Sequence, residues 1–260
     1  METRRDRFNA KMTSIWKGAR LLACTIPGPI VATYVLAITY MNFFAIKEFP
    51  ISTIAVIDCA FLLSWIPFLI TDMVTKALEI HAAISLAIFG CSCNVVFSVF
   101  LWFVTLIPSS LGIFSDKPQV QTAIESVFGG SHLAIIFGSA LSLFVAIVVK
   151  SLIIWNMDKK YNEDEKMSVK IFYKEVAISS LVGQLVDNSI FAFFSAYLLF
   201  HWDFNKIFWS VIIKTALELV MEMLCLPMGY MRCSQCKEDG ICEKYMNFIA
   251  EEKAKKLKQN

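Results

Sequence analysis

The residues of this chain best suited to chemistry lie inside a long apolar segment. Four polar or aromatic residues there follow i, i+4, i+7 and i+11 spacing, so they share one face of a helix: Ser180, Gln184, Asp187 and Phe191. Ionisable groups at membrane depth are costly and usually functional. We therefore interpret Gln184 and Asp187 as ligand-binding candidates. For Ser180 and Gly183 we favour close packing between helices.

A second polar stripe lies in the last apolar segment. Lys214, Glu218 and Glu222 follow i, i+4 and i+8 spacing on one helical face. Such side chains cannot face lipid, so they must face the bundle interior or a watery cavity. Two interpretations stay open. Lys214 neutralises Glu218 or Asp187 for structural reasons, or the stripe forms a polar substrate path or a proton relay.

A third polar group follows a proline. Pro67 should kink or interrupt its helix and free a carbonyl. Thr71, Asp72 and Thr75 would then lie near the cytoplasmic mouth, although Asp72 alone would also suit a surface. Asp58 lies deeper in the same segment and has no partner that the sequence identifies.

Apolar segments of membrane-spanning length must position these groups. The chain has 260 residues, of which 57% are hydrophobic and only 18% charged. A bilayer core about 30 Å thick needs about 20 apolar residues in a helix. Backbone groups in lipid must bond within their own segment, which predicts helices. Six windows meet or approach that length: Ile30–Ile46, Ile51–Ile70, Ala82–Ile107, Leu133–Met157, Val176–Phe200 and Ile207–Met228. We therefore expect an all-α, polytopic membrane protein with six transmembrane helices.

The placement of basic residues predicts the orientation. With six spans, nineteen of the 24 lysines and arginines fall on the side of the termini, and three on the opposite side. Basic residues accumulate on the cytoplasmic side, so both termini should lie inside. We expect a basic amphipathic segment over 1–29, a transporter domain over 30–230 and a charged cytoplasmic tail over 231–260.

Three cysteines in the tail follow a spacing that can hold zinc. Cys233, Cys236 and Cys242 supply three thiols, but a structural zinc site wants four ligands and no histidine follows them. A reducing cytoplasm favours unpaired thiols. We therefore expect no metal and no cofactor.

The two polar segments together resemble the queuosine precursor transporter family, also called the vitamin uptake transporter family. Its motif S-x-x-G-Q-x-x-D-x-x-I-F stands intact at Ser180–Phe191 and includes Asn188. Its T-D-x-x-T-E motif stands as Thr71–Lys76, with lysine in place of the final glutamate. Asn42 and Lys214 are softer matches. The tyrosine-glycine and double-arginine stretch of the family is absent, and so is the G-Q-x-x-D of its fourth span, where Leu143–Lys150 stands.

The resemblance implies uptake of queuine or its precursors, which are 7-deazaguanine bases, or of a related planar nutrient. A guanine-like edge presents adjacent N–H donors that a carboxylate can accept, while an aromatic ring can stack on the base. The candidate substrate-binding residues are Asp187, Gln184, Ser180, Asn188, Phe191, Asp72, Thr71, Asn42, Lys214 and Glu218.

The alternatives differ in class. No motif of a serine hydrolase or zinc protease and no phosphate loop occurs, so we expect no enzyme. A substrate-binding subunit of an energy-coupling vitamin transporter, with an ATPase partner, is the second hypothesis. The expected partners are a small-molecule substrate and the lipid bilayer, without nucleic acid, and a homo-oligomer is compatible with the sequence. The expected location is a prokaryotic plasma membrane.

Overall fold

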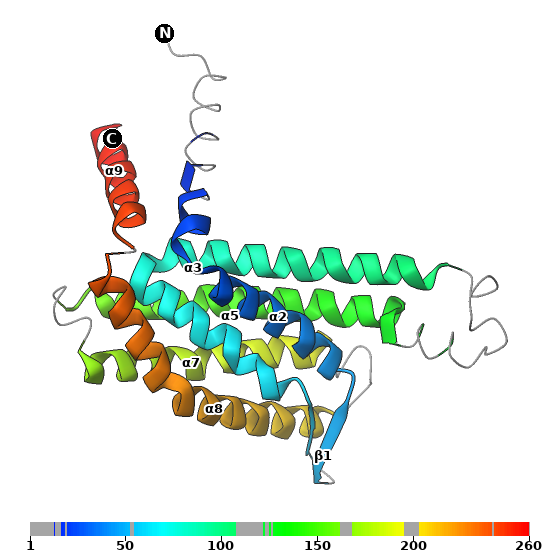
Figure 1. Cartoon of the computed structure of the whole chain (residues 1–260). Helices are drawn as coiled ribbons and strands as arrows, with labels where there is room; N and C mark the ends of the chain where they lie inside the picture. The colour runs from blue at the N-terminus through cyan, green and yellow to red at the C-terminus, as the bar shows by residue number, and fades with distance from the viewer. Residues whose placement is uncertain are drawn as a thin grey trace.

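Long helices running side by side make up most of the fold (Figure 1). The computed structural model describes residues 20–52, 55–107, 127–161, 168–194, 203–240 and 242–259, together with positions 13, 17, 18, 122 and 125. Its main helices are α2 (Gly28–Phe44), α3 (Phe61–Thr105), α5 (Gly130–Asp158), α7 (Val169–Ala192), α8 (Phe204–Glu238) and α9 (Glu243–Gln259). The helical windows expected from apolar length therefore largely correspond to real helices.

Helix α3 reverses direction without a loop. Its backbone is helical except at Glu79, where φ is 69° and ψ is 171°. A positive φ is uncommon for a residue with a side chain and stores strain. The reversal joins the second and third expected windows into two limbs, Phe61–Leu78 and Ile80–Thr105. Figure 1 shows the first limb running away from the hairpin and the second limb returning.

A β-hairpin replaces the start of the second expected span. β1 (Glu48–Ser52) pairs antiparallel with β2 (Ala55–Asp58). The expectation that the whole Ile51–Ile70 window is helical was therefore wrong. Isoleucine and valine residues favour strands, and the ladder between the two strands satisfies the backbone groups that a helix would otherwise satisfy. Strand β2 is buried and packs on α8, at the opposite end of the bundle from α9 (Figure 1).

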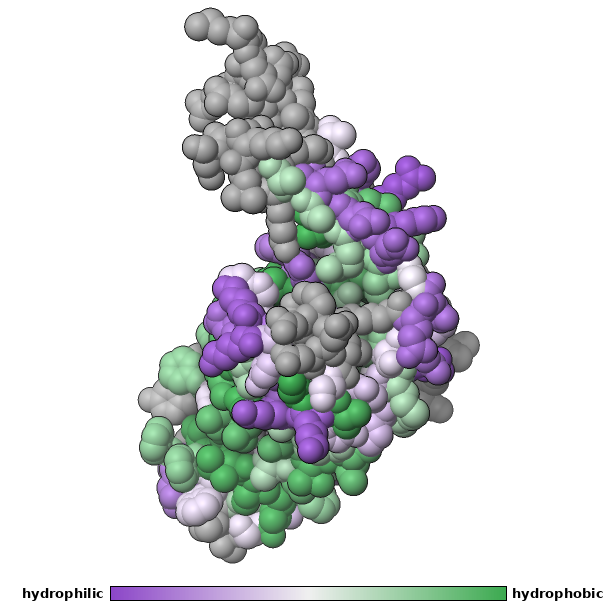
Figure 2. Space-filling view, turned by 90° about the vertical axis from the view of Figure 1, so that its left-hand side faces the viewer, coloured by the Kyte–Doolittle hydropathy of each residue, from purple (hydrophilic) through white to green (hydrophobic). Residues whose placement is uncertain are grey.

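The N-terminal segment and helix α9 meet at one end of the bundle. A Cβ atom at Gly18 would lie 3.1 Å from Cε1 of Phe248, and Lys17 Nζ lies 5.4 Å from the centroid of that ring. Burial raises the pKa of Tyr245, also on α9, to about 12, and nearby Glu79 adds to the shift. Seen from this end, hydrophilic side chains gather around α9, and apolar side chains cover the flank below (Figure 2). The tail is thus docked by its apolar face.

The flanks of the bundle expose large apolar side chains. Phe100 is 61% exposed, Phe137 56% and Leu224 71%. A soluble monomer seldom exposes so many of them. Two described helices, α3 and α5, are long and apolar enough to cross a membrane by length and composition. Helices α7 and α8, which carry the buried Glu175, Asp187, Lys214, Glu218 and Glu222, fall outside that pair.

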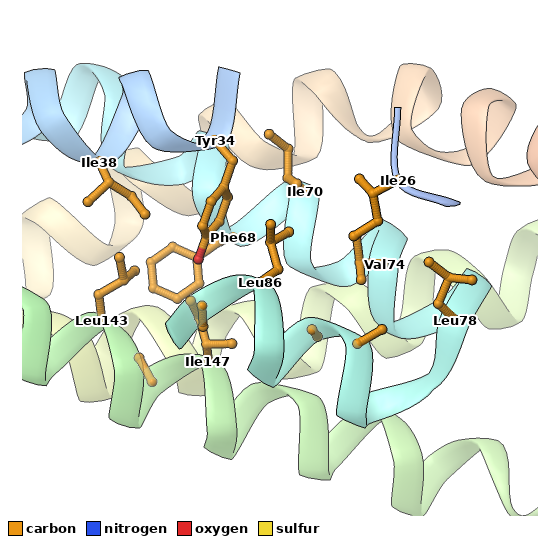
Figure 3. Packing of buried hydrophobic residues seen from close by; sticks show 14 of the residues in the cluster. Ile26, Tyr34, Ile38, Phe68, Ile70, Val74, Leu78, Leu86, Leu143 and Ile147 are labelled. Atoms are coloured by element: carbon orange, nitrogen blue, oxygen red, sulfur yellow. The ribbon is translucent and has the colours of Figure 1, made fainter. Parts of the chain in front are cut away.

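A hydrophobic core joins α2 to both limbs of α3 and to α5 (Figure 3). The ring of Tyr34 packs against Gly90, where a Cβ atom would lie only 2.4 Å from Tyr34 Cε1. Phe68, Leu143 and Ile147 are fully buried nearby. This core holds one side of the bundle rigid, while the polar groups lie between the first limb of α3 and helices α5, α7 and α8.

Candidate functional site

Three buried lysines hold carboxylates at three levels of the bundle. We call them the hairpin-end cluster (Asp58, Lys214 and Glu218), the central cluster (Asp72, Lys150 and Glu222) and the tail-end cluster (Lys76, Asp158 and Glu175). Each cluster joins groups from at least two elements. Because a buried charge needs a partner, these clusters account for how apolar helices carry so many ionisable groups.

The hairpin-end cluster ties β2 to α8. Lys214 Nζ lies 2.7 Å from Asp58 Oδ2 but 4.0 Å from Glu218 Oε1. Glu218 is bonded by two other groups. The hydroxyl of Ser64 bonds to its Oε1, and Asn188 Nδ2 donates to its Oε2 at 2.7 Å. Lys214 also lies 5.0 Å from the ring centroid of Phe191. The lysine therefore binds the hairpin more closely than its neighbour on its own helix.

The central cluster ties α3, α5 and α8 together. Lys150 Nζ lies 2.8 Å from Glu222 Oε1 and 2.9 Å from Asp72 Oδ2. Ser180 Oγ donates to Glu222 Oε1 at 2.8 Å, and Gln184 Nε2 donates to Glu222 Oε2 at 2.7 Å. All five side chains are almost completely buried. The motif on α7 thus binds the carboxylate of α8 directly.

The tail-end cluster borders a cavity. Lys76 Nζ lies 2.5 Å from Glu175 Oε2 and 2.6 Å from Asp158 Oδ1. The adjoining cavity has a volume of about 460 Å³ and is lined by parts of α3, the end of α5 and the start of α9. Thr75, which precedes Lys76 in α3, has its Oγ1 atom 3.2 Å from Ser151 Oγ of α5. Polar groups therefore continue from the central cluster to this cavity.

Several buried polar side-chain atoms of the described residues have no hydrogen-bond partner. Four of them are acceptor oxygens on the middle of α7 and on α3: Gln184 Oε1, Asp187 Oδ1, Asn188 Oδ1 and Asp72 Oδ1. The others are the hydroxyl of Tyr34, both amide atoms of Asn94, and Glu175 Oε1. An unsatisfied buried acceptor costs about 1–3 kcal/mol, so natural structures keep few of them. Four such acceptors with complementary donors missing indicate a place for a ligand that supplies N–H or O–H groups.

A small cavity lies between these groups and the hairpin. Its volume is about 50 Å³, and Asp58, Asn188, Phe191 and Lys214 contribute to its lining. Drug-sized ligand pockets run from about 300 to 1,000 Å³. Backbone N–H of Val56 on β2 donates to Ser210 Oγ of α8 at 3.1 Å and closes the hairpin over the cavity. In this conformation the hairpin end of the polar interior is closed.

The structure brings most of the expected site residues together but leaves two aside. Asp72, Lys214 and Glu218 belong to the hairpin-end and central clusters. Ser180, Gln184, Asn188 and Phe191 contact members of these clusters. Thr71 Oγ1 instead donates within its own helix, to the carbonyls of Pro67 and Phe68. Asn42 Nδ2 likewise donates to the carbonyl of Ile38 in α2. These two bonds serve the helices themselves.

The carboxylate of Asp187 stands apart from the lysines. Among the described residues no lysine or arginine lies within ion-pair distance of it. The nearby hydroxyl of Ser142 on α5 donates to the carbonyl of Ser139 in its own helix at 3.0 Å, and the Oδ1 atom of Asp187 has no partner. Lys214, expected to balance this charge, acts on it only at longer range.

Sequence reasoning missed three functional contacts. Lys150 was recognised as a residue within a span, but the two carboxylates that it joins come from helices far apart in the sequence. The partner of Asp58 is Lys214, 156 residues away. Ser64 carried no signal, because a lone serine in an apolar helix is ordinary. The one available clue for Lys150 was its charge in mid-segment, which demands an acidic partner.

The bundle encloses three lysine–carboxylate clusters, and its outer surface exposes apolar side chains. Together these features define a helical membrane protein with a polar interior. The chain belongs to the family described as "Putative vitamin uptake transporter", whose model matches residues 58–232. That stretch includes all three clusters and the hairpin residue Asp58. No curated protein and no solved structure matches the chain.

Proposed function

We propose that this protein imports a small planar nutrient whose edge carries several N–H donors. A queuosine precursor of the 7-deazaguanine type, such as queuine or its 7-cyano or 7-aminomethyl precursors, fits best. The observation that carries this proposal is a group of three unpartnered acceptors within residues 184–188 of α7, namely Gln184 Oε1, Asp187 Oδ1 and Asn188 Oδ1. A guanine-like edge offers a ring N–H and an exocyclic amine side by side, which such acceptors satisfy.

Each residue of the site has a distinct proposed role. Asp187 accepts from the donor edge, since its Oδ1 atom has no hydrogen-bond partner and none of the described lysines forms an ion pair with its carboxylate. Gln184 and Asn188 offer their carbonyl oxygens, because their amide N–H groups are already committed to α8. Phe191 lines the small cavity and stacks on the flat face. Ser180 holds Glu222 and orients the motif.

The closed hairpin fits one step of a transport cycle. A purine-sized base needs far more than the cavity of about 50 Å³ at the hairpin end. Entry therefore requires the bonds of Val56 to Ser210 and of Asp58 to Lys214 to open. At the other end, the cavity of about 460 Å³ provides an exit vestibule.

The topology belongs to the same proposal. Six helical passes, both termini in the cytoplasm and the hairpin outside would put uptake in a prokaryotic plasma membrane. The contact of Lys17 and Gly18 with Phe248 of α9, at the end of the bundle opposite the hairpin, supports this arrangement. The chain acts on its substrate by binding and release without a catalytic step.

Matched ligands test the substrate class. Purified protein is titrated with queuine, 7-aminomethyl-7-deazaguanine, 7-deazaguanine and 7-deazahypoxanthine, which lacks only the exocyclic amine. Loss of one donor to a charged acceptor costs about 1.5–3 kcal/mol. We therefore expect 7-deazahypoxanthine to bind at least tenfold more weakly than 7-deazaguanine. Equal affinity for these two bases, or no binding of any deazaguanine, would contradict the proposal.

A further inference from the structure

Glu218 differs from the lysine-paired acids of the hairpin and of the central cluster in the kind of partner it has. Asp58 accepts from Lys214 at 2.7 Å and from the backbone N–H of Ala60, which can only donate. In the central cluster, Lys150 bridges Asp72 and Glu222. An ammonium group and a backbone N–H cannot accept a proton from an acid, so these partners favour the ionised form of the carboxylates that they contact.

The surroundings of Glu218 suit both of its charge states. The hydroxyl of Ser64 donates to a carboxylate and can equally accept from a protonated acid without moving. Asn188 Nδ2 donates to the other oxygen in either state. Glu218 itself is fully buried. Protonation therefore leaves no hydrogen bond unmade at this residue.

Lys214 stands between two carboxylates that compete for it. It lies 2.7 Å from Asp58 on the hairpin and 4.0 Å from Glu218. Glu218 is surrounded by groups from four elements. On α8 these are Lys214 and, one turn further on, Glu222. The others are Asp58 of β2, Ser64 of α3, and Asp187 and Asn188 of α7. This surplus of acids over one lysine cannot all stay ionised in a buried site. The unpartnered Oδ1 of Asn188, in a side chain that lines the same cavity, marks a place where a ligand completes the site.

We propose that Glu218 carries the proton that drives transport, and that Lys214 couples the charge state of Glu218 to the position of the hairpin. A proton from the hairpin side joins a carboxylate oxygen of Glu218 and makes it neutral. Lys214 then pairs with Asp58 alone, and the hairpin closes. When the same O–H bond breaks toward the tail end, ionised Glu218 draws Lys214 away from Asp58, and the hairpin opens again. This coupling rests on the transport function proposed above, but the hairpin movement does not depend on which substrate is carried.

The first experiment follows the hairpin without any substrate. Cys59 is partly exposed and directly follows β2. Its alkylation by an impermeant maleimide is measured by mass spectrometry from pH 5.5 to 8.5 in purified protein. Each variant is compared with wild type at the same pH, which removes the chemistry of the thiol itself. Glu218→Gln should label at least threefold less than wild type at pH 8.5 and equally at pH 5.5.

Two further variants complete that experiment. Glu238→Gln makes the same chemical change on an exposed residue of α8, and it should follow wild type throughout. Glu218→Asp keeps an acid and should keep the pH dependence. If Glu218→Gln tracks wild type over the whole range, the coupling proposal fails.

The second experiment measures coupling in proteoliposomes loaded with labelled 7-aminomethyl-7-deazaguanine, with the membrane potential clamped. A gradient of one pH unit can concentrate a solute by about tenfold per proton moved. In wild type, the ratio of base concentration between the two sides of the membrane should approach this tenfold value. In Glu218→Gln the ratio should stay at one, although this variant should still exchange labelled for unlabelled base. Concentrative uptake by Glu218→Gln would overturn the coupling. Absence of exchange in wild type would instead contradict the proposed substrate and leave the Cys59 result to decide the coupling.

Discussion

Gly183 of α7 lies directly against the aliphatic chain of Lys150 on α5. A Cβ atom at position 183 would come 3.1 Å from Lys150 Cβ and 3.3 Å from its Cδ. The absence of a side chain at Gly183 therefore lets the lysine pass between the two helices and reach Asp72 and Glu222. A glycine of the motif on α7 thus positions a cation that belongs to another helix.

Gly183→Ala should destabilise the protein by about 1–3 kcal/mol, the usual cost of overpacking a well-filled interior. The added methyl group pushes Lys150 away from its carboxylates, so ligand affinity should fall as well. Thermal unfolding in detergent measures the first effect. Gly28→Ala is the matched control, since a Cβ atom there would meet nothing within 4 Å. If the Gly183→Ala protein is as stable as the control, the methyl group fits without displacing Lys150, and the prediction is wrong.

Asp187→Asn should weaken substrate binding by about 1.5–3 kcal/mol and leave the melting temperature nearly unchanged. The reason is that Asp187 has no lysine or arginine within ion-pair distance among the described residues, so its loss strands no cation. Titration with 7-deazaguanine and a melting curve give the two quantities. The opposite pattern, a large loss of stability repaired by adding Lys214→Met, would make Asp187 a structural partner of that lysine.

Lys76→Met should be among the most destabilising single changes at the tail end. It leaves the fully buried Glu175 and the nearby Asp158 without their cation, and breaking a buried pair in this way costs about 3–5 kcal/mol. Adding Glu175→Gln should recover most of the loss, since the uncompensated charge is then gone. Chemical denaturation of the single and double variants measures the coupling free energy between Lys76 and Glu175. If the losses of the two single variants simply add in the double variant, the contact contributes no stability.

A reporter enzyme that is active only outside the cytoplasm should stay inactive when fused after Asn260. The basic residues gathered on the side of the termini should keep both ends inside the cell. A cysteine-reactive impermeant reagent applied to intact cells should conversely reach Cys59 beside the hairpin. An active C-terminal reporter would invert the orientation and place the hairpin in the cytoplasm.

Local patterns predicted the helices well, because apolar length is a property of each segment alone. The shared face of Ser180 and Gln184 was likewise readable from helical spacing, and both side chains bind Glu222. The hairpin was not predicted, since residues 51–57 form one apolar run with the helix that follows them. The choice between strand and helix depends on the packing of β2 against α8 and on the ladder between β2 and β1.

The partners of the ionisable groups lay beyond the reach of one sequence. Asp58 and Lys214 pair across 156 positions, and Lys150 reaches Glu222 across 72. Spacing within a helix shows which residues share a face, but not which face of another helix it meets. Thr71 shows that spacing also leaves the local hydrogen bonds of a side chain open. Its position after Pro67 predicted a binding residue, and in the structure its hydroxyl donates to carbonyls of its own helix.

Because the two limbs of α3 join at Glu79 without a loop, a rotation about this residue would move the second limb as one rigid unit. That limb, Ile80–Thr105, is 26 residues long and so measures about 39 Å at 1.5 Å per residue. A tilt of about 10° around Glu79 would move the far tip by about 7 Å, which follows from that length. The pivot lies beside the cavity of about 460 Å³ at the tail end. Binding or release of a small solute there would therefore be amplified into a large displacement at the far tip of this limb.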